Sequence, residues 1–177
     1  TNSLGSATSI DVNDPLYGSQ WHLYSTFGIQ APVAWQSTTG SPAIVVAVLD
    51  TGITSHPDLE GRILPGYDFI SDATAANDDQ SDGKFLSWDA DASDPGDWGG
   101  SNDSSWHGTH VAGIIAASAN STGVRGVAPN VSLLPVRVLG TTGGATSDLI
   151  AAIHWAAGLD VAGVPKNTNP ARVINLS

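Results

Sequence analysis

Residues 43–52 read Ala-Ile-Val-Val-Ala-Val-Leu-Asp-Thr-Gly, and this stretch decides the fold class of the chain. Its first seven residues are continuously apolar and rich in β-branched side chains. This composition is typical of a strand buried on both faces, as in a parallel sheet covered by helices. The strand is expected to end at Asp50, at the sheet edge where the ligand and catalytic crevices of open α/β sheets lie.

Two helices and two further strands are predicted after this strand. Apolar residues at helical spacing predict helices over residues 107–119 and 146–158. Strands are expected over residues 131–139 and 172–176, although Pro135 cannot donate a hydrogen bond to a neighbouring strand. The alternation of strands and helices predicts an α/β domain with a parallel sheet and right-handed crossovers.

The two ends of the sequence carry further expectations. Residues 1–12 are mostly small and polar and are expected to form an extended or disordered N-terminus. Residues 13–177 are expected to be the first part of a larger domain, because the apolar strand over 172–176 needs neighbours on both sides. Since the sequence contains no Met, we expect that a secretory leader and a pro-segment were removed ahead of Thr1.

Composition excludes several classes of partner. The 177 residues include 17 acidic and 6 basic side chains, which gives a formal net charge of −11. Such a charge repels phosphate, so no nucleic acid is expected as a partner. No run of about 18 apolar residues occurs, so no spanning helix and no membrane partner are expected. The absence of Cys excludes a disulfide framework and a thiolate metal site.

Ten aspartates lie between residues 68 and 103, opposed only by Lys84. These carboxylates repel one another unless solvent or cations separate them. The segment is therefore either a flexible acidic loop or a calcium-binding insert, since Ca²⁺ takes about 6 to 8 oxygen ligands. Tryptophans within the segment favour calcium, because disordered acidic tracts are poor in aromatic residues. The candidate ligands in this insert are Asp78, Asp82, Asp89, Asp91 and Asp97.

A histidine motif supplies a candidate for acid–base chemistry. Residues 107–113 read His-Gly-Thr-His-Val-Ala-Gly at the start of the first predicted helix, and Gly108 leaves one face of His107 unobstructed. From there His107 can reach the end of the 43–49 strand, where Asp50 would hold one ring nitrogen and fix the tautomer. Asp50 and His107 are therefore the predicted catalytic pair.

Five motifs follow one another along the chain. They are Asp50-Thr51-Gly52 with His56-Pro57-Asp58-Leu59, the His107 motif, Gly126-Val127-Ala128-Pro129, Val136-Arg137-Val138-Leu139 and Val173-Ile174-Asn175-Leu176-Ser177. In this order they resemble the subtilisin family of serine proteases, from about Asn13 to the end of the chain. The Asp-rich insert is similar to that of secreted bacterial members with additional calcium loops. The resemblance implies a subtilisin-like α/β fold, secretion and peptide-bond hydrolysis by an Asp-His-Ser triad.

The resemblance also implies roles for individual residues. Asp50 would orient and stabilise the imidazolium, and His107 would be the general base. The residues that would bind the extended polypeptide substrate are Leu139, Gly143, Gly144, Ala145 and Ser177. Those that would hold the strong Ca²⁺ site are Asp14, Asp58 and Asn120, with the carbonyl groups of Ser118, Thr122 and Val124.

The remaining triad member has no counterpart in this sequence. A family member needs a Ser in a Gly-Thr-Ser setting at the start of a later helix, and an Asn for the oxyanion hole. Ser177 is not interpreted as the nucleophile, because no glycine elbow or helix start follows it. We expect a second chain, carrying the rest of the catalytic domain, to supply both groups. This chain alone is expected to be inactive.

Three alternatives remain open. Asp-Thr-Gly at 50–52 also resembles the active site of aspartic proteases, but a single copy requires a homodimer, and pepstatin would inhibit it. A zinc hydrolase using His107 and His110 lacks a Glu general base between them. A calcium-binding, catalytically inactive fragment or scaffold is the non-enzymatic alternative. A fluorophosphonate that labels nothing would favour it.

Overall fold

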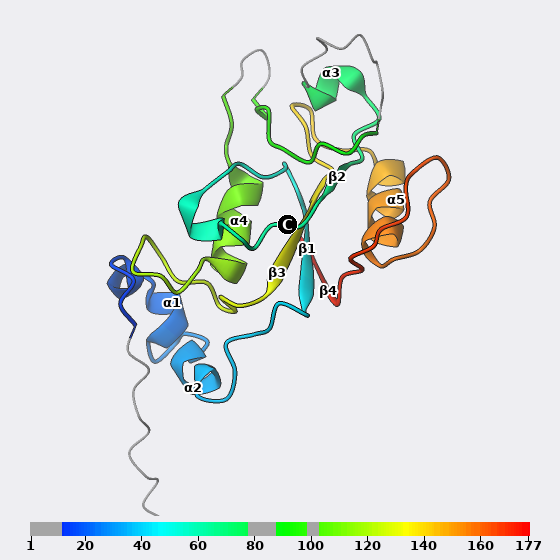
Figure 1. The fold of residues 1–177 in the computed structure, drawn as a ribbon. Helices are drawn as coiled ribbons and strands as arrows, with labels where there is room; N and C mark the ends of the chain where they lie inside the picture. The colour runs from blue at the N-terminus through cyan, green and yellow to red at the C-terminus, as the bar shows by residue number, and fades with distance from the viewer. Residues whose placement is uncertain (1–11, 78–87, 99–102) are drawn as a thin grey trace, which may run out of the picture.

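The computed structural model describes residues 12–77, 88–98 and 103–177 (Figure 1). Its elements are η1 Tyr17–Ser19, α1 Trp21–Tyr24, α2 Ala31–Trp35, β1 Val45–Asp50, η2 Pro57–Leu59, β2 Tyr67–Asp68, α3 Ala73–Ala76, α4 His107–Ala116, β3 Ser132–Arg137, α5 Thr146–Ala156 and β4 Val173–Leu176. The predicted calcium ligands Asp78 and Asp82 lie outside the described residues. None of the described helices has the length and apolar character needed to cross a bilayer.

A four-stranded parallel sheet forms the centre of the molecule. Its strand order is β2-β3-β1-β4, and every pairing of these strands is parallel. Strand β1 begins at Val45, two residues after the start of the predicted run at Ala43, and all six of its residues are buried, as predicted. This arrangement confirms the predicted α/β fold with a parallel sheet.

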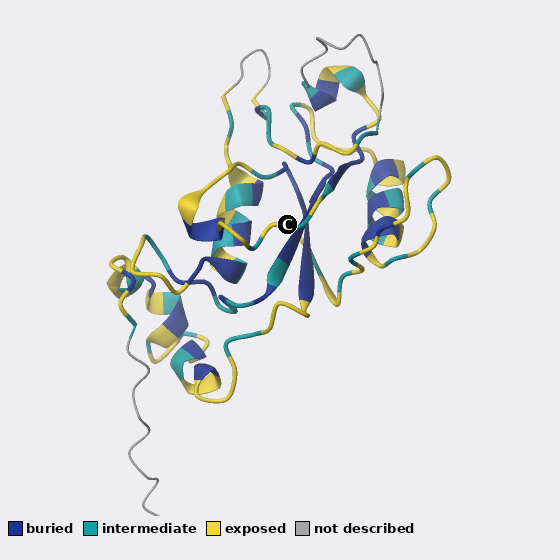
Figure 2. Ribbon diagram, in the orientation of Figure 1, coloured by how far each residue is buried: buried dark blue, intermediate teal, exposed yellow. Residues whose placement is uncertain are grey.

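Helices cover both faces of the sheet (Figures 1 and 2). On one face Val46 and Val48 of β1 pack with Ala112 and Ala116 of α4. On the other face lie Val45, Ala47 and Leu49 of β1, with Ala152, Trp155 and Ala156 of α5. Alternate residues of β1 therefore serve two separate cores, which explains why the strand is apolar at consecutive positions.

Strand β3 accommodates Pro135 because the position of its missing N–H faces the short strand β2 and not β1. Leu133 N–H donates to Arg62 O, and Phe69 N–H donates to Arg137 O. Pro135 alternates in phase with Leu133 and Arg137, so its backbone faces the same side of β3. On that side β2 pairs with β3 only at Tyr67 and Asp68. The missing donor thus lies next to the shortest ladder of the sheet.

Helix α5 ends at Ala156, two residues before its predicted end, and two other elements also end earlier than predicted. Helix α4 stops at Ala116 rather than near Ala119, because Ala117 O accepts from Gly126 N–H and Ser118 N–H donates to Asp58 O. Strand β3 spans Ser132–Arg137 rather than 131–139, because the next two N–H groups, of Val138 and Leu139, both donate to Asp50 O. Both deviations come from contacts with distant segments.

The first aspartate of the predicted insert belongs to the sheet. Asp68 is the last residue of β2 and is 2% exposed, and its Oδ2 accepts a hydrogen bond from the buried Arg137 Nη1 at 2.5 Å. Its Oδ1 accepts from Ile70 N–H. This carboxylate is therefore compensated by a buried guanidinium.

Candidate active site

The ends of β1 and α4 bring Asp50 and His107 into contact. Asp50 is the last residue of β1 and His107 the first of α4, 57 positions later. Asp50 Oδ1 lies 2.7 Å from His107 Nδ1. The Asp50 side chain is 1% exposed, whereas that of His107 is 47% exposed. The imidazole therefore bridges a buried carboxylate and the molecular surface, which suits a group that exchanges protons with a bound reactant.

Neighbouring backbone groups hold the Asp50 carboxylate in place. Thr51 N–H donates to Asp50 Oδ1 at 2.7 Å, so the same oxygen receives both Thr51 and the imidazole. The other oxygen, Oδ2, is buried and has no hydrogen-bond partner among the described residues. A buried, sparsely solvated carboxylate stabilises a positive charge that forms on the adjacent ring.

Glycines allow the helix to approach the strand end. A Cβ atom on Gly108 would lie 2.3 Å from Gly52 O and 3.1 Å from Asp50 Cβ. Gly108 N–H donates to Thr51 Oγ1 at 3.1 Å. The sequence predicts that Gly108 leaves one face of His107 unobstructed. In the structure, its lack of a side chain lets α4 lie directly against the end of β1.

Replacement of Gly108 by Ala is therefore expected to push α4 away from β1 and lengthen the Asp50–His107 contact. The added methyl group meets backbone, so we expect a loss of unfolding free energy of about 1–3 kcal/mol. Chemical denaturation measures this loss. The matched control is Gly113→Ala in the same helix, where nothing lies within 4 Å of the new Cβ. Equal stability of the two variants would contradict this explanation.

The predicted substrate-binding residues gather at the same sheet edge. Leu139 follows β3 and Ser177 follows β4, on either side of the strand that ends at Asp50. Gly140 and Gly143 exchange two backbone hydrogen bonds of 3.0 Å, and Gly143 has a φ of +90°. The segment Gly143, Gly144 and Ala145 that follows is exposed and borders a cavity of about 120 Å³ with Ile70 and Asp148.

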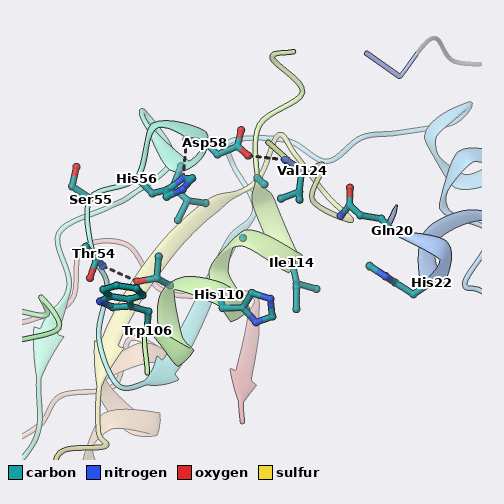
Figure 3. Close-up of a pocket in the computed structure, with 14 residues that line it drawn as sticks. Gln20, His22, Thr54, Ser55, His56, Asp58, Trp106, His110, Ile114 and Val124 are labelled. Atoms are coloured by element: carbon teal, nitrogen blue, oxygen red, sulfur yellow. Dashed lines mark hydrogen bonds between the residues drawn. The ribbon is translucent and has the colours of Figure 1, made fainter. Parts of the chain in front are cut away.

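Two buried carboxylates from the predicted strong calcium site lie against one loop. Asp58 Oδ2 accepts from Val124 N–H at 3.1 Å, as Figure 3 shows, and Asp58 O accepts from Ser118 N–H. Asp14 Oδ1 accepts from Asn120 N–H at 3.1 Å. The structure therefore brings the predicted residues of this site together around residues 118–124.

The donors at this loop fit a hard cation. Asp58 Oδ1 is buried and has no hydrogen-bond partner among the described residues. A Cβ on Gly123 would lie 2.5 Å from Asp58 Oδ2, so the loop leaves the carboxylate no room for a further side chain. Carboxylate, amide and carbonyl oxygens are the ligands that Ca²⁺ prefers, and no nitrogen or sulfur ligand is in the predicted set.

The described part of the Asp-rich insert forms local turns. Asp91 N–H donates to Asp89 Oδ1 and Ser93 N–H to Asp91 Oδ1, and hydrogen bonds from Ser93 lower the pKa of Asp91. Burial raises the pKa of Asp97, but hydrogen bonds led by those from Ser105 outweigh it and lower the pKa overall. Within the described ranges no three His, Cys, Asp or Glu side chains are grouped to hold a metal. Calcium binding by this insert stays a prediction.

A second face of α4 borders a pocket that the sequence analysis missed (Figure 3). The pocket has a volume of about 700 Å³, and its lining includes His22, His56, His110 and Ile114. The pocket and β1 lie against different faces of α4. Gly108, Ala112 and Ala116 are the buried residues of α4, whereas His110 and Ile114 face the pocket. His110 therefore lies on a different side of the helix from the residues that contact β1.

The chain is similar to known proteins in both sequence and structure. Residues 41–177 match the family model described as the subtilase family. An extracellular protease of Xanthomonas campestris is 51% identical over 176 residues, covering 93% of this chain and 29% of that protein. An extracellular basic protease of Dichelobacter nodosus is 46% identical over 180 residues, with the same two shares. A solved structure of proteases from Pseudoalteromonas arctica has a TM-score of 0.85 and 50% identity, and covers 93% of this chain and 49% of that one. The chain thus spans less than half the length of each of these relatives.

Proposed function

The chain belongs to the subtilase family, and on this premise we propose that it is the Asp- and His-bearing part of a secreted serine endopeptidase. The observation that carries the proposal is the contact of 2.7 Å between Asp50 Oδ1 and His107 Nδ1. When His107 Nδ1–H donates to the buried carboxylate, the lone pair of the neutral ring lies on Nε2. His107 then acts as a general base through Nε2.

The proposed reaction proceeds in two halves. His107 Nε2 takes the proton of a serine hydroxyl while the serine oxygen attacks the peptide carbonyl carbon, which gives a tetrahedral oxyanion. The imidazolium then gives this proton to the leaving amine, and the C–N bond breaks to leave an acyl-enzyme. Water then attacks the acyl carbon while His107 Nε2 takes its proton. The imidazolium returns this proton to the serine oxygen as the acyl–oxygen bond breaks and the acid leaves. Asp50 stays ionised throughout and stabilises the imidazolium.

The serine and the oxyanion donor are proposed to come from a further segment, in a second chain that completes the catalytic domain. Ser177 is unsuited to the role of nucleophile, because its hydroxyl donates to Asn175 Oδ1 at 2.8 Å and the residue follows β4 rather than opening a helix. Without the serine, only a residual fraction of catalysis remains. This chain alone is therefore proposed to be inactive.

The substrate is proposed to be an extended polypeptide. Gly143, Gly144 and Ala145 form an exposed stretch beside the sheet edge, where substrate backbone can add to it by strand pairing. Leu139 would shape the neighbouring pocket, and Ser177 would begin the wall of the primary specificity pocket. The names of the two extracellular relatives support secretion. Maturation is proposed to involve a pro-segment.

Calcium is proposed as the structural cofactor. The side chains of Asp14, Asp58 and Asn120, with carbonyl groups of residues 118, 122 and 124, would hold the ion. Bound Ca²⁺ would offset the charge of the buried Asp58 and add to the charge that Arg125 already places 3.5 Å from Asp14. It would also tie the segment at Asp14 to the loop after α4. The unpartnered Oδ1 of Asp58 supports this assignment. A second group of ligands is proposed in the insert, at Asp78, Asp82, Asp89, Asp91 and Asp97.

We call the assembly of this chain with the serine-bearing segment the completed protease. A panel of inhibitors applied to it separates the proposal from the aspartic protease and metal hydrolase alternatives. A fluorophosphonate is expected to abolish hydrolysis of a peptide anilide at neutral pH, whereas pepstatin and a zinc-selective chelator are expected to leave it unchanged. Inhibition by pepstatin at acid pH would indicate an aspartic protease. Loss of activity on zinc chelation would indicate a metal hydrolase. Either result would overturn the serine mechanism.

A further inference from the structure

Two aspartates of the 94–97 turn reach the start of α4 through serine hydroxyls. Ser104 Oγ donates to Asp94 Oδ2 at 2.6 Å and accepts from Trp106 N–H at 2.8 Å. Ser105 Oγ donates to Asp97 Oδ2 at 2.6 Å and accepts from His107 N–H at 3.2 Å. We call these two chains of hydrogen bonds the Asp–Ser bridges. They end on two backbone N–H groups, one of which belongs to His107.

The bridges act on a residue with strained backbone. Trp106 is the N-cap of α4 and has φ 52° and ψ 29°, in the left-handed region that bulky residues rarely adopt. Its own side chain makes no capping hydrogen bond and it is 61% exposed, so packing of the indole does not hold this conformation. Such strain persists only where neighbouring contacts impose it. Ser104 Oγ accepts from the N–H of Trp106, and Ser105 Oγ accepts from the next N–H, that of His107. These two hydrogen bonds flank the Trp106 backbone and supply those contacts.

The same turn is tied to the strand end that carries Asp50. Thr51 Oγ1 donates to Asp94 Oδ2 at 3.4 Å and accepts from Gly108 N–H. Asp94 N–H donates to Ile53 O at 3.1 Å, and Asp94 Oδ1 accepts from Gly96 N–H at 3.0 Å. Asp94 is therefore fixed relative to β1 and contacts the start of α4 through Ser104.

We propose that Asp94 and Asp97, acting through Ser104 and Ser105, are positioning residues that set the start of α4 so that His107 meets Asp50. The Asp–Ser bridges end on the backbone N–H groups of Trp106 and His107 and not on the imidazole ring. They impose the backbone turn at Trp106 from which the imidazole is directed toward the carboxylate. The inference rests on the proposed role of His107 as general base and adds four residues to the site.

Serine variants test the bridges without changing a carboxylate. In the completed protease at saturating Ca²⁺, Ser104→Ala and Ser105→Ala are each expected to lower kcat about 10-fold, and the double variant about 100-fold. KM is expected to stay within about two-fold, because ground-state binding is not altered. The matched control is Ser41→Ala, which removes a hydroxyl that accepts from a backbone N–H two residues later in an exposed turn. Its kcat is expected to be unchanged. Unchanged kcat in the double variant would overturn the proposal.

A double-mutant cycle tests whether Asp94 acts through Ser104. If it does, Asp94→Ala combined with Ser104→Ala loses no more kcat than the more damaged single variant. Fully multiplicative losses would show that the two side chains act independently, which contradicts the bridge.

Proton NMR separates failure of the bridges from failure of the proposed function. The His107 Nδ1–H that donates to Asp50 is expected to give a low-field resonance in the unsubstituted protein, and this resonance is expected to broaden or vanish in the Ser104→Ala/Ser105→Ala variant. An absence of fluorophosphonate labelling and of hydrolysis would overturn the proposed function alone, since the resonance still tests the bridges. A resonance that is identical in both proteins would overturn the bridges, whatever the activity.

Discussion

Replacement of His107 by Ala is expected to lower kcat of the completed protease by about 10⁶-fold, the order of loss measured for the triad histidine in subtilisin. The physical reason is that Ala leaves no base at 2.7 Å from the Asp50 carboxylate to take the serine proton. Steady-state hydrolysis of a peptide anilide measures the effect, with KM expected to change little.

Two further variants test whether the loss of kcat is specific to the Asp50–His107 pair. Asp50→Asn is expected to lower kcat by about 10⁴-fold, as the equivalent change does in trypsin, because the amide favours the wrong imidazole tautomer. The matched control is His154→Ala, since His154 is exposed in the last turn of α5. Full activity of the His107 variant, or an equal loss in the His154 variant, would contradict the assignment.

Removal of calcium is expected to produce the largest loss of stability. A ligand present at about 1000 times its Kd adds about 4 kcal/mol to the folded state, so EGTA is expected to lower Tm by roughly 10 °C. The reason is that Asp58, which is 2% exposed, would be left without the charge that offsets its burial, whereas Asp14 keeps its ion pair with Arg125 at 3.5 Å. Thermal unfolding with excess Ca²⁺ and with excess EGTA measures the difference.

An Asp58 variant tests whether the calcium that stabilises the protein is bound at Asp58. Asp58→Asn is expected to have the lower Tm in either solution, with little further change on addition of EGTA. The control is Asp160→Asn, because that carboxylate is 85% exposed and forms only a surface ion pair with Lys166. It is expected to keep the full response to EGTA. An unchanged Tm of the parent protein in EGTA would refute the calcium assignment, and a full response in Asp58→Asn would refute this site.

The parts of the fold that depend on local pattern could be predicted from the sequence. The apolar run from Ala43 to Leu49 predicted a strand buried on both faces, which the structure forms over Val45–Asp50. Its neighbours α4 and α5 pack against the two faces. The order of strands and helices then predicted the parallel sheet. Asp50 and His107 could be paired because a strand end and a helix start in such a fold lie at one edge.

The parts of the fold and of the site that depend on contacts between distant segments could not be predicted from the sequence. The two-residue strand β2 is too short to give a pattern, and Asp68 looked like part of an acidic loop because its partner Arg137 lies 69 positions away. The role of Gly108 also depends on the carbonyl of Gly52, which no local pattern reveals. The Asp–Ser bridges were missed because Asp94 and Asp97 were considered together with the other carboxylates of the insert.

The central claim is that this chain supplies the Asp–His pair to a serine carried on another segment. Intact mass spectrometry of the completed protease after treatment with a fluorophosphonate tests it most directly, with the His107→Ala variant treated in parallel. One adduct is expected, on a serine outside residues 1–177, and it is expected to form rapidly in the parent protein and far more slowly in the variant. An adduct on Ser177, or equal labelling of the two proteins, would contradict it.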